Sequence, residues 1–229
     1  MKAHQVELLK SVEGLKPSRV LDAGSGSGIL GDSLSKMGFE VFSLDLYDIP
    51  KHGHFGRFVR ADLNRPIPFA DSSFDYILCS ESLQYLENHS GVFREFRRAL
   101  RPDGRLILTI PNLLNAASRL YFLQRGYFPS FKPVRTMKAG KGWDFLAYNP
   151  LSFIDIVEFA GRSGMELTAF KGSGVKGSSL PLYPILKALY SIGLLFEKNP
   201  EKSRLIKRLS SSDLLLCDHV IMQFGPKAA

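Results

Sequence analysis

Glycines at alternating positions follow a short apolar segment near the N-terminus. The segment is Arg19–Ala23 (RVLDA), and Gly24, Gly26 and Gly28 come directly after it. Glycine lets the backbone turn tightly and leaves no Cβ in the way of a bound molecule. Asp22 adds a carboxylate two residues before the first of these glycines. Because a carboxylate attracts a cation and repels a phosphate, this stretch predicts a binding loop for a positively charged, phosphate-free group.

The same glycines also fit a second binding pattern. Residues 26–31 (GSGILG) spell the G-x-G-x-x-G fingerprint of dinucleotide-binding proteins, and Asp45 lies about the expected distance downstream. A dinucleotide brings its pyrophosphate to the N-terminus of the helix that follows the loop. Since Asp22 would repel that pyrophosphate, we favour the cationic ligand and keep an NAD-dependent Rossmann oxidoreductase as an alternative.

Strand-like and helix-like segments alternate along the chain and must position these residues. The predicted strands are Arg19–Ala23, Glu40–Asp45, Arg57–Ala61, Phe74–Ser80, Arg105–Ile110, Glu166–Phe170 and Leu214–Phe224. The predicted helices are Met1–Gly14, Gly28–Met37, Ser90–Leu100, Asn115–Gln124 and Pro150–Ser163, the last with Pro150 in its first turn. This alternation predicts an α/β fold with a mostly parallel sheet and helices on both faces.

Several stretches of this sequence resemble the class I S-adenosylmethionine-dependent methyltransferase family. Residues 20–28 (VLDAGSGSG) are similar to its nucleotide-binding loop, and residues 67–80 (IPFADSSFDYILCS) to the segment leading into its fourth strand. Residues 100–108 (LRPDGRLIL) are similar to the segment before its fifth strand, with Asp103 in place of a family glycine. The likeness covers about residues 18–112 well and the rest loosely, and it points to type 11 or type 23 small-molecule or cell-surface-pathway enzymes. It implies a Rossmann-like, doubly wound sheet of seven strands with an antiparallel last strand and cap insertions.

The resemblance also implies S-adenosyl-L-methionine as cofactor, S-adenosyl-L-homocysteine as product, and a set of binding residues. In the family, the residue matching Asp45 accepts hydrogen bonds from both ribose hydroxyls, a geometry that suits a carboxylate. The residue matching Asp62 takes the adenine amino group, and the one matching Leu63 packs on the ring. A capping role for Asp45 and a surface-loop role for Asp62 are the structural alternatives. The implied cofactor-binding residues are Asp22, Gly24, Ser25, Gly26, Gly28, Asp45, Leu46, Asp62, Leu63 and Ser80.

Methyl transfer is an in-line displacement, so alignment of the reactants matters more than any single catalytic group. Positioning alone can supply on the order of 7 to 11 kcal/mol. If the acceptor is a hydroxyl, proton removal could use His89, Glu81, Tyr85 or Asp144. Many relatives carry a histidine where this chain has Tyr85. Its role has either passed to His89 or is not needed.

The acceptor is expected to bind segments over the carboxyl ends of the strands. Residues 141–151 (KGWDFLAYNPL) resemble the cap of bacterial methyltransferases of cell-surface polysaccharide and lipid-linked pathways. Trp143, Asp144 and Tyr148 are the predicted substrate-binding residues, although relatives commonly have a histidine near the Asn-Pro-Leu. The acceptor classes implied are a small molecule, a glycan or a lipid-linked molecule. No cluster of His, Asp and Glu at ligand spacing predicts a metal.

The 229 residues suit a single α/β domain with insertions. We predict one methyltransferase domain over 1–229, with 1–112 as the cofactor-binding half and 113–149 and 172–212 as substrate-cap insertions. The net charge is +8, but the basic segments contain no RNA-binding motif interleaved with aromatic residues, so nucleic acid is not favoured as a partner. Cys79 and Cys217 lie in apolar segments and are expected to be free thiols. Without an apolar signal-peptide core, the chain is expected to stay in the cytoplasm.

An apolar segment interrupts the region before the last predicted strand. Residues 180–196 (LPLYPILKALYSIGLLF) are too short to span a bilayer and contain Lys187. Flanked by Lys and Arg residues up to 208, this segment predicts either peripheral contact with the inner face of a membrane or a helix that covers the substrate cleft. A non-catalytic methyltransferase-like partner protein is a further alternative, and the sequence indicates no oligomeric state.

Overall fold

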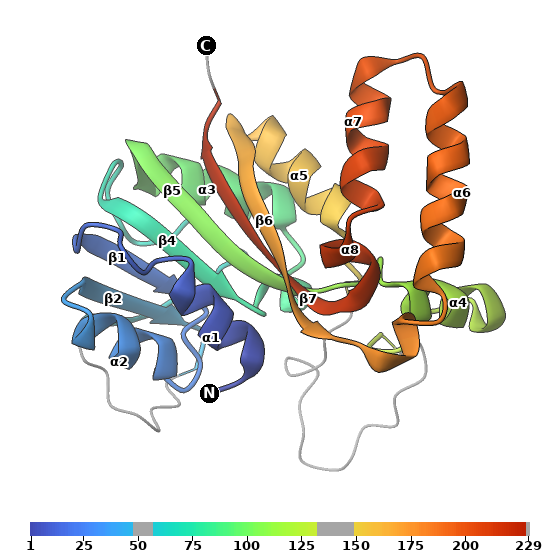
Figure 1. The fold of residues 1–229 in the computed structure, drawn as a ribbon. Coiled ribbons are helices and arrows are strands. Elements are labelled where there is room, and N and C mark those ends of the chain that lie inside the picture. The colour runs from blue at the N-terminus through green and yellow to red at the C-terminus, as the bar shows by residue number, and fades with distance from the viewer. Residues whose placement is uncertain (48–56, 132–148, 228–229) are drawn as a thin grey trace.

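The centre of the protein is one seven-stranded sheet (Figure 1). The computed structural model describes residues 1–47, 57–131 and 149–227. Along the sheet the strands follow the order β3-β2-β1-β4-β5-β7-β6. The strands are β1 (Arg19–Ala23), β2 (Glu40–Asp45), β3 (Arg57–Arg60), β4 (Phe74–Ser80), β5 (Leu100–Pro111), β6 (Met165–Val175) and β7 (Cys217–Pro226). Neighbouring strands run parallel except β7, which is antiparallel to both β5 and β6. The predicted fold class is therefore confirmed.

The helices are α1 (Ala3–Lys10), α2 (Ile29–Lys36), α3 (His89–Ala99), α4 (Ala116–Arg125), α5 (Phe153–Arg162), α6 (Tyr183–Phe196), α7 (Pro200–Leu209) and α8 (Ser212–Leu216). Helices α1 and α2 cover one face of the sheet, and α3 and α5 cover the other. Side chains of a strand alternate between its two faces, so each helical layer has its own apolar cluster. Val20 packs in the cluster shared with α1 and α2, whereas Leu21 and Ala23 pack in the cluster shared with α3 and α5. Asp22 therefore lies on the α1 and α2 face.

Several predicted elements have different bounds in the structure; the strand predicted at Arg105–Ile110, for example, begins at Leu100. The helix expected from Pro150 begins at Phe153, because the Ser152 hydroxyl accepts from the Asp155 amide and the Asp155 carboxylate accepts from the Ser152 amide. This reciprocal capping box fixes the start of the helix more strongly than a proline does. The strand expected at Leu214–Phe224 is preceded by α8 and starts at Cys217. The predicted start of the second insertion at 172 lies inside β6, which continues to Val175.

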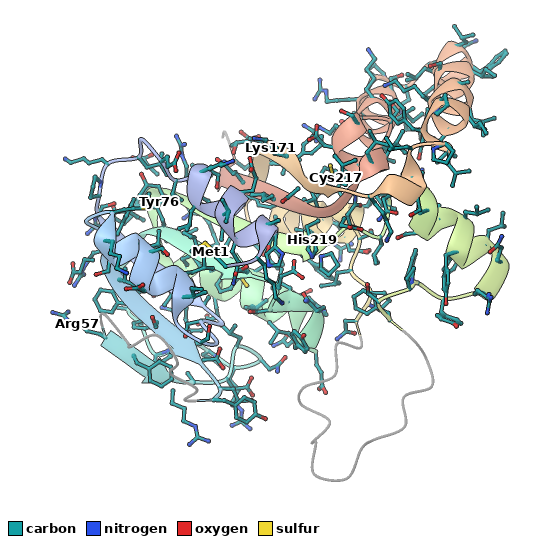
Figure 2. All side chains as sticks on the ribbon, turned by 60° about the horizontal axis from the view of Figure 1, so that its bottom comes forward. Met1, Arg57, Tyr76, Lys171, Cys217 and His219 are labelled. Carbon is teal, nitrogen blue, oxygen red and sulfur yellow. The ribbon has the colours of Figure 1, made fainter. Side chains whose placement is uncertain are left out.

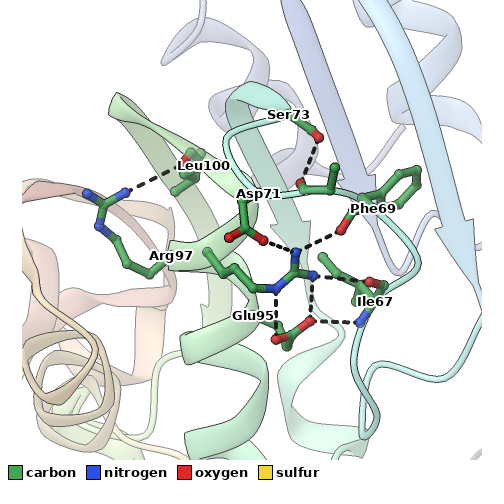
Figure 3. A network of polar contacts seen from close by, with 9 residues as sticks. Ile67, Phe69, Asp71, Ser73, Glu95, Arg97 and Leu100 are labelled. Carbon is green, nitrogen blue, oxygen red and sulfur yellow. Dashed lines mark hydrogen bonds and ion pairs between the residues drawn. The ribbon is translucent and has the colours of Figure 1, made fainter.

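Arg98 of α3 ties the segment before β4 to the helix (Figure 3). Its guanidinium makes a two-pronged contact with the Glu95 carboxylate, at 3.0 and 2.8 Å. It also donates to the carbonyls of Ile67 and Phe69, at 3.2 and 2.8 Å, and to Asp71 at 2.7 Å. Such forked, charge-assisted contacts need the planar guanidinium. Arg98 therefore fixes the loop that leads into the strand of the site.

We expect Arg98→Lys to lower the free energy of unfolding by about 1–3 kcal/mol, because a lysine keeps the charge but cannot serve these acceptors together. Urea unfolding followed by circular dichroism measures the change. Arg97→Lys is the matched control, since Arg97 makes only long contacts, at 3.5 and 3.3 Å, to two carbonyls. Equal losses in both variants would contradict this role for Arg98.

Candidate active site

The glycine loop after β1 has a backbone that only glycine adopts readily. Gly24, Gly26 and Gly28 have φ angles of +78°, +51° and +76°. A Cβ on Gly24 would lie 2.1 Å from the hydroxyl oxygen of Ser82, so the close approach of loop and β4 also requires glycine there. A Cβ on Gly26 would meet nothing within 4 Å. The loop is thus packed against Ser82 at Gly24, whereas the space beside Gly26 is open.

Asp45 at the end of β2 holds this loop directly. One carboxylate oxygen accepts from the Gly26 amide at 2.7 Å, and the other accepts from the Tyr47 amide at 3.0 Å. The Leu44 carbonyl accepts from the amides of Gly24 and Ser25, at 2.8 and 3.0 Å. Each carboxylate oxygen keeps a further lone pair, so Asp45 can still accept from a bound hydroxyl. Leu46, the next residue along, is 41% exposed.

Asp22 lies behind the loop rather than in front of it. Its side chain is fully buried, on the face of β1 that α2 covers. Burial raises the pKa of Asp22 to about 7, and the negative charge of Asp45 raises it further. The nearby Gly31 amide lowers this pKa, although it does not reach hydrogen-bond geometry with the Asp22 carboxylate. Asp22 therefore lies within the core beside α2, and its contact with a bound cation stays a prediction.

Asp62 and Leu63 border the other side of the loop. Leu63 is buried, and one of its methyl carbons lies 3.8 Å from the Cβ position of Gly24. One oxygen of Asp62 accepts from the amide and the side-chain nitrogen of Asn64, at 2.9 and 3.1 Å. Asp62 therefore shapes the turn after β3 and keeps its other oxygen for weaker contacts, such as Arg65 at 3.9 Å.

A second polar cluster lies at the same end of the sheet, over β4 and β5 and beside the start of β7, where Figure 2 labels His219. Glu81 directly follows β4 with a φ of +56°, a conformation that costs a non-glycine residue energy. One of its carboxylate oxygens accepts from the Thr109 hydroxyl at 3.3 Å, and the other lies 3.7 Å from the His219 ring nitrogen. The His219 ring in turn lies 4.5 Å from the ring of His4 in α1.

The ionisation of this cluster is set mainly by burial. Burial raises the pKa of Glu81 to about 7, although the Thr109 hydroxyl, Lys2 and Gln84 pull it down. Burial lowers the pKa of His219, and burial together with the charge of His219 lowers that of His4 to about 4. At neutral pH the histidines are therefore uncharged and Glu81 is poised to take up or release a proton.

The predicted catalytic residues divide between two places. Glu81 belongs to the cluster, while Tyr85 is 40% exposed in the short helical turn Leu83–Tyr85. The His89 ring nitrogen bonds the Leu83 carbonyl at 3.0 Å, and its ring stacks on Phe159 at 5.5 Å. His89, the first residue of α3, thus packs against Phe159 of α5, and its role as a base stays a prediction.

The remaining predicted residues are placed as follows. The Ser80 hydroxyl lies 3.2 Å from the Thr109 hydroxyl at the end of β4. Trp143, Asp144 and Tyr148 lie outside the described residues. Among residues 1–47, 57–131 and 149–227, no group of three or more His, Cys, Asp or Glu side chains could hold a metal ion.

The geometry places a glycine loop, an acid at the end of the second strand and a half-buried acid after the fourth at one edge of a β3-β2-β1-β4-β5-β7-β6 sheet. Residues 21–108 match a family profile described as a methyltransferase domain. The match covers 88 of the 229 residues and supports the resemblance to the class I S-adenosylmethionine-dependent methyltransferases. This methyltransferase domain contains both halves of the site: the loop from β1 to β3 and Glu81 after β4.

Curated relatives and a solved structure carry the same domain. A ubiquinone biosynthesis O-methyltransferase of Xanthomonas oryzae pv. oryzae (strain PXO99A) is 27% identical over 130 residues, which are 52% of this chain and 54% of that protein. A malonyl-[acyl-carrier protein] O-methyltransferase of Xylella fastidiosa (strain M23) is 32% identical over 151 residues, 58% of this chain and 50% of that protein. The chain therefore spans about half the length of these relatives.

A crystal structure of Burkholderia thailandensis 1,6-didemethyltoxoflavin-N1-methyltransferase, with bound 1,6-didemethyltoxoflavin and S-adenosylhomocysteine, shares the fold. The two superpose with a TM-score of 0.57 at 14% identity, over 98% of this chain and 76% of that one.

The loop of the methyltransferase domain fits the cofactor of its family. Open space in front of Gly26 leaves room for a ligand, and the buried Ser25 hydroxyl has no hydrogen-bond partner among the described residues. Asp45 and Asp62 offer anionic acceptors on either side, which suit the hydroxyls and amino groups of an adenosine. S-adenosylmethionine would therefore be held by the loop, Asp45 and the turn at Asp62.

Sequence reasoning missed His4, Thr109 and His219. A usable signal existed for His219, which is the third residue of β7. Because β7 is antiparallel, its first residues lie at the carboxyl ends of the parallel strands, and His219 pairs with Pro111 at the end of β5. Thr109 and His4 carried no comparable signal, since each lies within an otherwise ordinary strand or helix.

Proposed function

We propose that this protein transfers a methyl group from S-adenosylmethionine to an O, N or C nucleophile of a small-molecule, glycan or lipid-linked acceptor. The observation that supports this most directly is that the loop at Gly26 and the half-buried Glu81 lie at the same edge of the sheet. In a sheet of this kind, ligands bind outside the carboxyl ends of the strands where the strand order reverses, which here is between β1 and β4.

An oxygen acceptor is the form we favour. Both relatives described above are named as O-methyltransferases. An alcohol or phenol nucleophile loses a proton as it reacts, and a positioned base speeds such a step by roughly 10²–10⁴-fold. Glu81 has the raised pKa that a base working near neutral pH needs.

The chain's own residues divide the work of this reaction. When bound, the cofactor supplies an electrophilic methyl group on a positively charged sulfur. Asp45 and the glycine loop orient the nucleoside, and Glu81 accepts the acceptor's proton on a carboxylate oxygen. The Thr109 hydroxyl donates to Glu81 at 3.3 Å and fixes its direction, while uncharged His219 lies 3.7 Å from it without competing for the proton.

The remaining functional expectations are part of this proposal. We assign residues 1–229 to one methyltransferase domain, with 1–112 binding the cofactor and 113–149 and 172–212 forming the acceptor side. Trp143, Asp144 and Tyr148 are the proposed acceptor contacts. We place the protein in the cytoplasm, with peripheral contact at the inner face of a membrane through residues 180–208. No helix in the described part of the chain is long and apolar enough to cross a bilayer.

Calorimetry tests the binding half of this proposal. S-adenosylhomocysteine should bind the purified protein and NAD should not, and Gly26→Ala should weaken S-adenosylhomocysteine at least about 10-fold, because its methyl group enters the space of the ligand. Gly14→Ala is the matched control: Gly14 has a φ of +82° with nothing within 4 Å of a Cβ, so it carries the same backbone strain away from the site. Binding of NAD alone would support the oxidoreductase instead.

An assay of product formation tests the catalytic half. Incubation with S-adenosylmethionine and candidate hydroxylated acceptors should yield S-adenosylhomocysteine, measured by mass spectrometry. A protein that binds S-adenosylhomocysteine but never turns over would match the non-catalytic partner alternative.

A further inference from the structure

A pair of helices between β6 and β7 stands out from the body of the protein (Figure 1). These helices are α6 and α7, and no residue in either is buried. In both Figure 1 and Figure 2 the pair lies beyond α4 and β6, away from the glycine loop. The structure therefore does not place α6 over the cofactor site, and its exposed surface needs another explanation.

The outward face of α6 is a continuous apolar stripe. Ile185, Leu189, Ile192 and Phe196 recur at intervals of four, three and four residues, which puts them on one side of a helix. They are 59%, 59%, 52% and 78% exposed, and neighbouring Leu195 is 80% exposed. A row of large apolar side chains in water is uncommon on a protein that works alone.

The orientation of α6 is fixed by its opposite face. Leu186, Tyr190 and Leu194 are half-buried on that side. The Tyr190 hydroxyl accepts from Arg119 of α4, and the Lys187 amine donates to the Ser210 carbonyl at 2.9 Å. These contacts hold the apolar stripe outward instead of letting it turn inward.

Helix α4 extends the apolar surface at the root of the pair. Leu120, Phe122 and Leu123 are 40%, 45% and 82% exposed. The Ala117 amide donates to the Ser179 hydroxyl at 3.3 Å, which joins α4 to the segment that leads into α6. Figure 1 shows α4 and α6 together at this end of the molecule. We call the exposed apolar residues of α4 and α6 the apolar face.

The segment that contains α6 and α7 carries an excess of positive charge. Residues 180–209 contain six Lys and Arg and two Glu, a net charge of +4. Lys202, Arg204 and Lys207 of α7 are exposed. An apolar helical face beside a row of cations is the pattern of a helix that lies in the interface of an anionic bilayer. A second copy of the chain is disfavoured as the occupant, because pairing of the two faces would bring like charges together.

We propose that the apolar face and the cations of α7 dock the protein on an anionic lipid surface, with α6 lying along the interface and not crossing it. The inference rests on the proposed membrane location and deepens it by naming the residues and the lipid charge. It also favours a lipid-linked acceptor among the proposed classes, since docking would bring the sheet edge near such molecules.

Flotation with vesicles tests the docking. Vesicles of phosphatidylcholine mixed equally with phosphatidylglycerol should carry at least about 10-fold more protein than vesicles of phosphatidylcholine alone, and high salt should reduce the difference. The double change Leu189→Gln and Ile192→Gln should abolish flotation, whereas Ile154→Gln, at an exposed apolar residue of α5, should not. Arg204→Glu should weaken flotation, whereas Lys16→Glu should not.

Two results would overturn the proposal: no flotation with the anionic vesicles, or flotation that is indifferent to salt and to Arg204→Glu. A dimer in gel filtration that the Leu189 and Ile192 double variant converts to monomer would overturn it in favour of a second copy. All variants should still bind S-adenosylhomocysteine in calorimetry, because the apolar face lies away from the loop. Loss of docking with binding retained therefore separates failure of this inference from failure of the proposed methyl transfer.

Discussion

Glu81→Gln is expected to lower kcat at least about 100-fold while leaving the affinity for S-adenosylhomocysteine unchanged, because the amide cannot accept the acceptor's proton. In the unchanged protein, kcat/KM should fall on the acidic side with a midpoint near the raised pKa of Glu81, about 7. Steady-state rates between pH 5 and 9, measured once an acceptor is in hand, give both quantities.

Stability separates this role from a structural one. The folded-state pKa of Glu81 lies above its ordinary value of 4.5, so its contribution to stability is fully present below that value and is lost as the pH rises through about 7. Glutamine has no charge to desolvate, and Glu81→Gln should therefore show an equal or higher Tm at pH 8. A lower Tm with full activity, or a rate loss in His89→Ala that exceeds the loss in Glu81→Gln, would contradict the assignment.

Asp45→Ala should weaken S-adenosylhomocysteine by about 100-fold or more. The change removes the acceptor of the Gly26 amide and the proposed acceptor of the ribose hydroxyls, and hydrogen bonds to a charged group are worth about 1.5–3 kcal/mol each. Titration calorimetry measures the affinity for S-adenosylhomocysteine. The affinity of Asp45→Asn should lie between those of the unchanged protein and Asp45→Ala, because asparagine keeps one acceptor oxygen.

Asp75→Ala is the matched control for Asp45→Ala. Asp75 likewise accepts from a backbone amide, that of Arg19 at 3.0 Å, but it lies at the opposite end of the sheet. The Asp75→Ala variant should be less stable than the unchanged protein but bind S-adenosylhomocysteine with the same affinity. Similar losses of affinity in both variants would mean that Asp45 acts only by holding the fold together.

The strands that carry the site were the most predictable part of this chain. β1, β2 and β4 have the predicted bounds, because each is an apolar run that ends at a polar residue or a glycine turn. The sequence of such an apolar run does not indicate which face of the sheet a given side chain occupies, since both faces of a central parallel strand are buried. Asp22 was therefore expected beside the ligand, and only the structure shows it on the α2 side.

Residues brought together from distant parts of the chain could not be predicted in the same way. Glu81, Thr109 and His219 meet only because β5 lies between β4 and β7, a neighbourhood set by the sheet and not by sequence spacing. His89 shows the same limit, because sequence spacing does not reveal its contacts with Leu83 and Phe159.

The placement of α6 and α7 between β6 and β7 has a consequence for how such a chain can diversify. Paired positions from Met165 with Pro226 to Val175 with Cys217 hold those two strands together independently of the helices that join them. Lengthening or replacing a connection of this kind costs little closure entropy, so the segment can be exchanged without retuning nucleoside recognition. The connection between β6 and β7 and the glycine loop after β1 can therefore vary separately within one polypeptide.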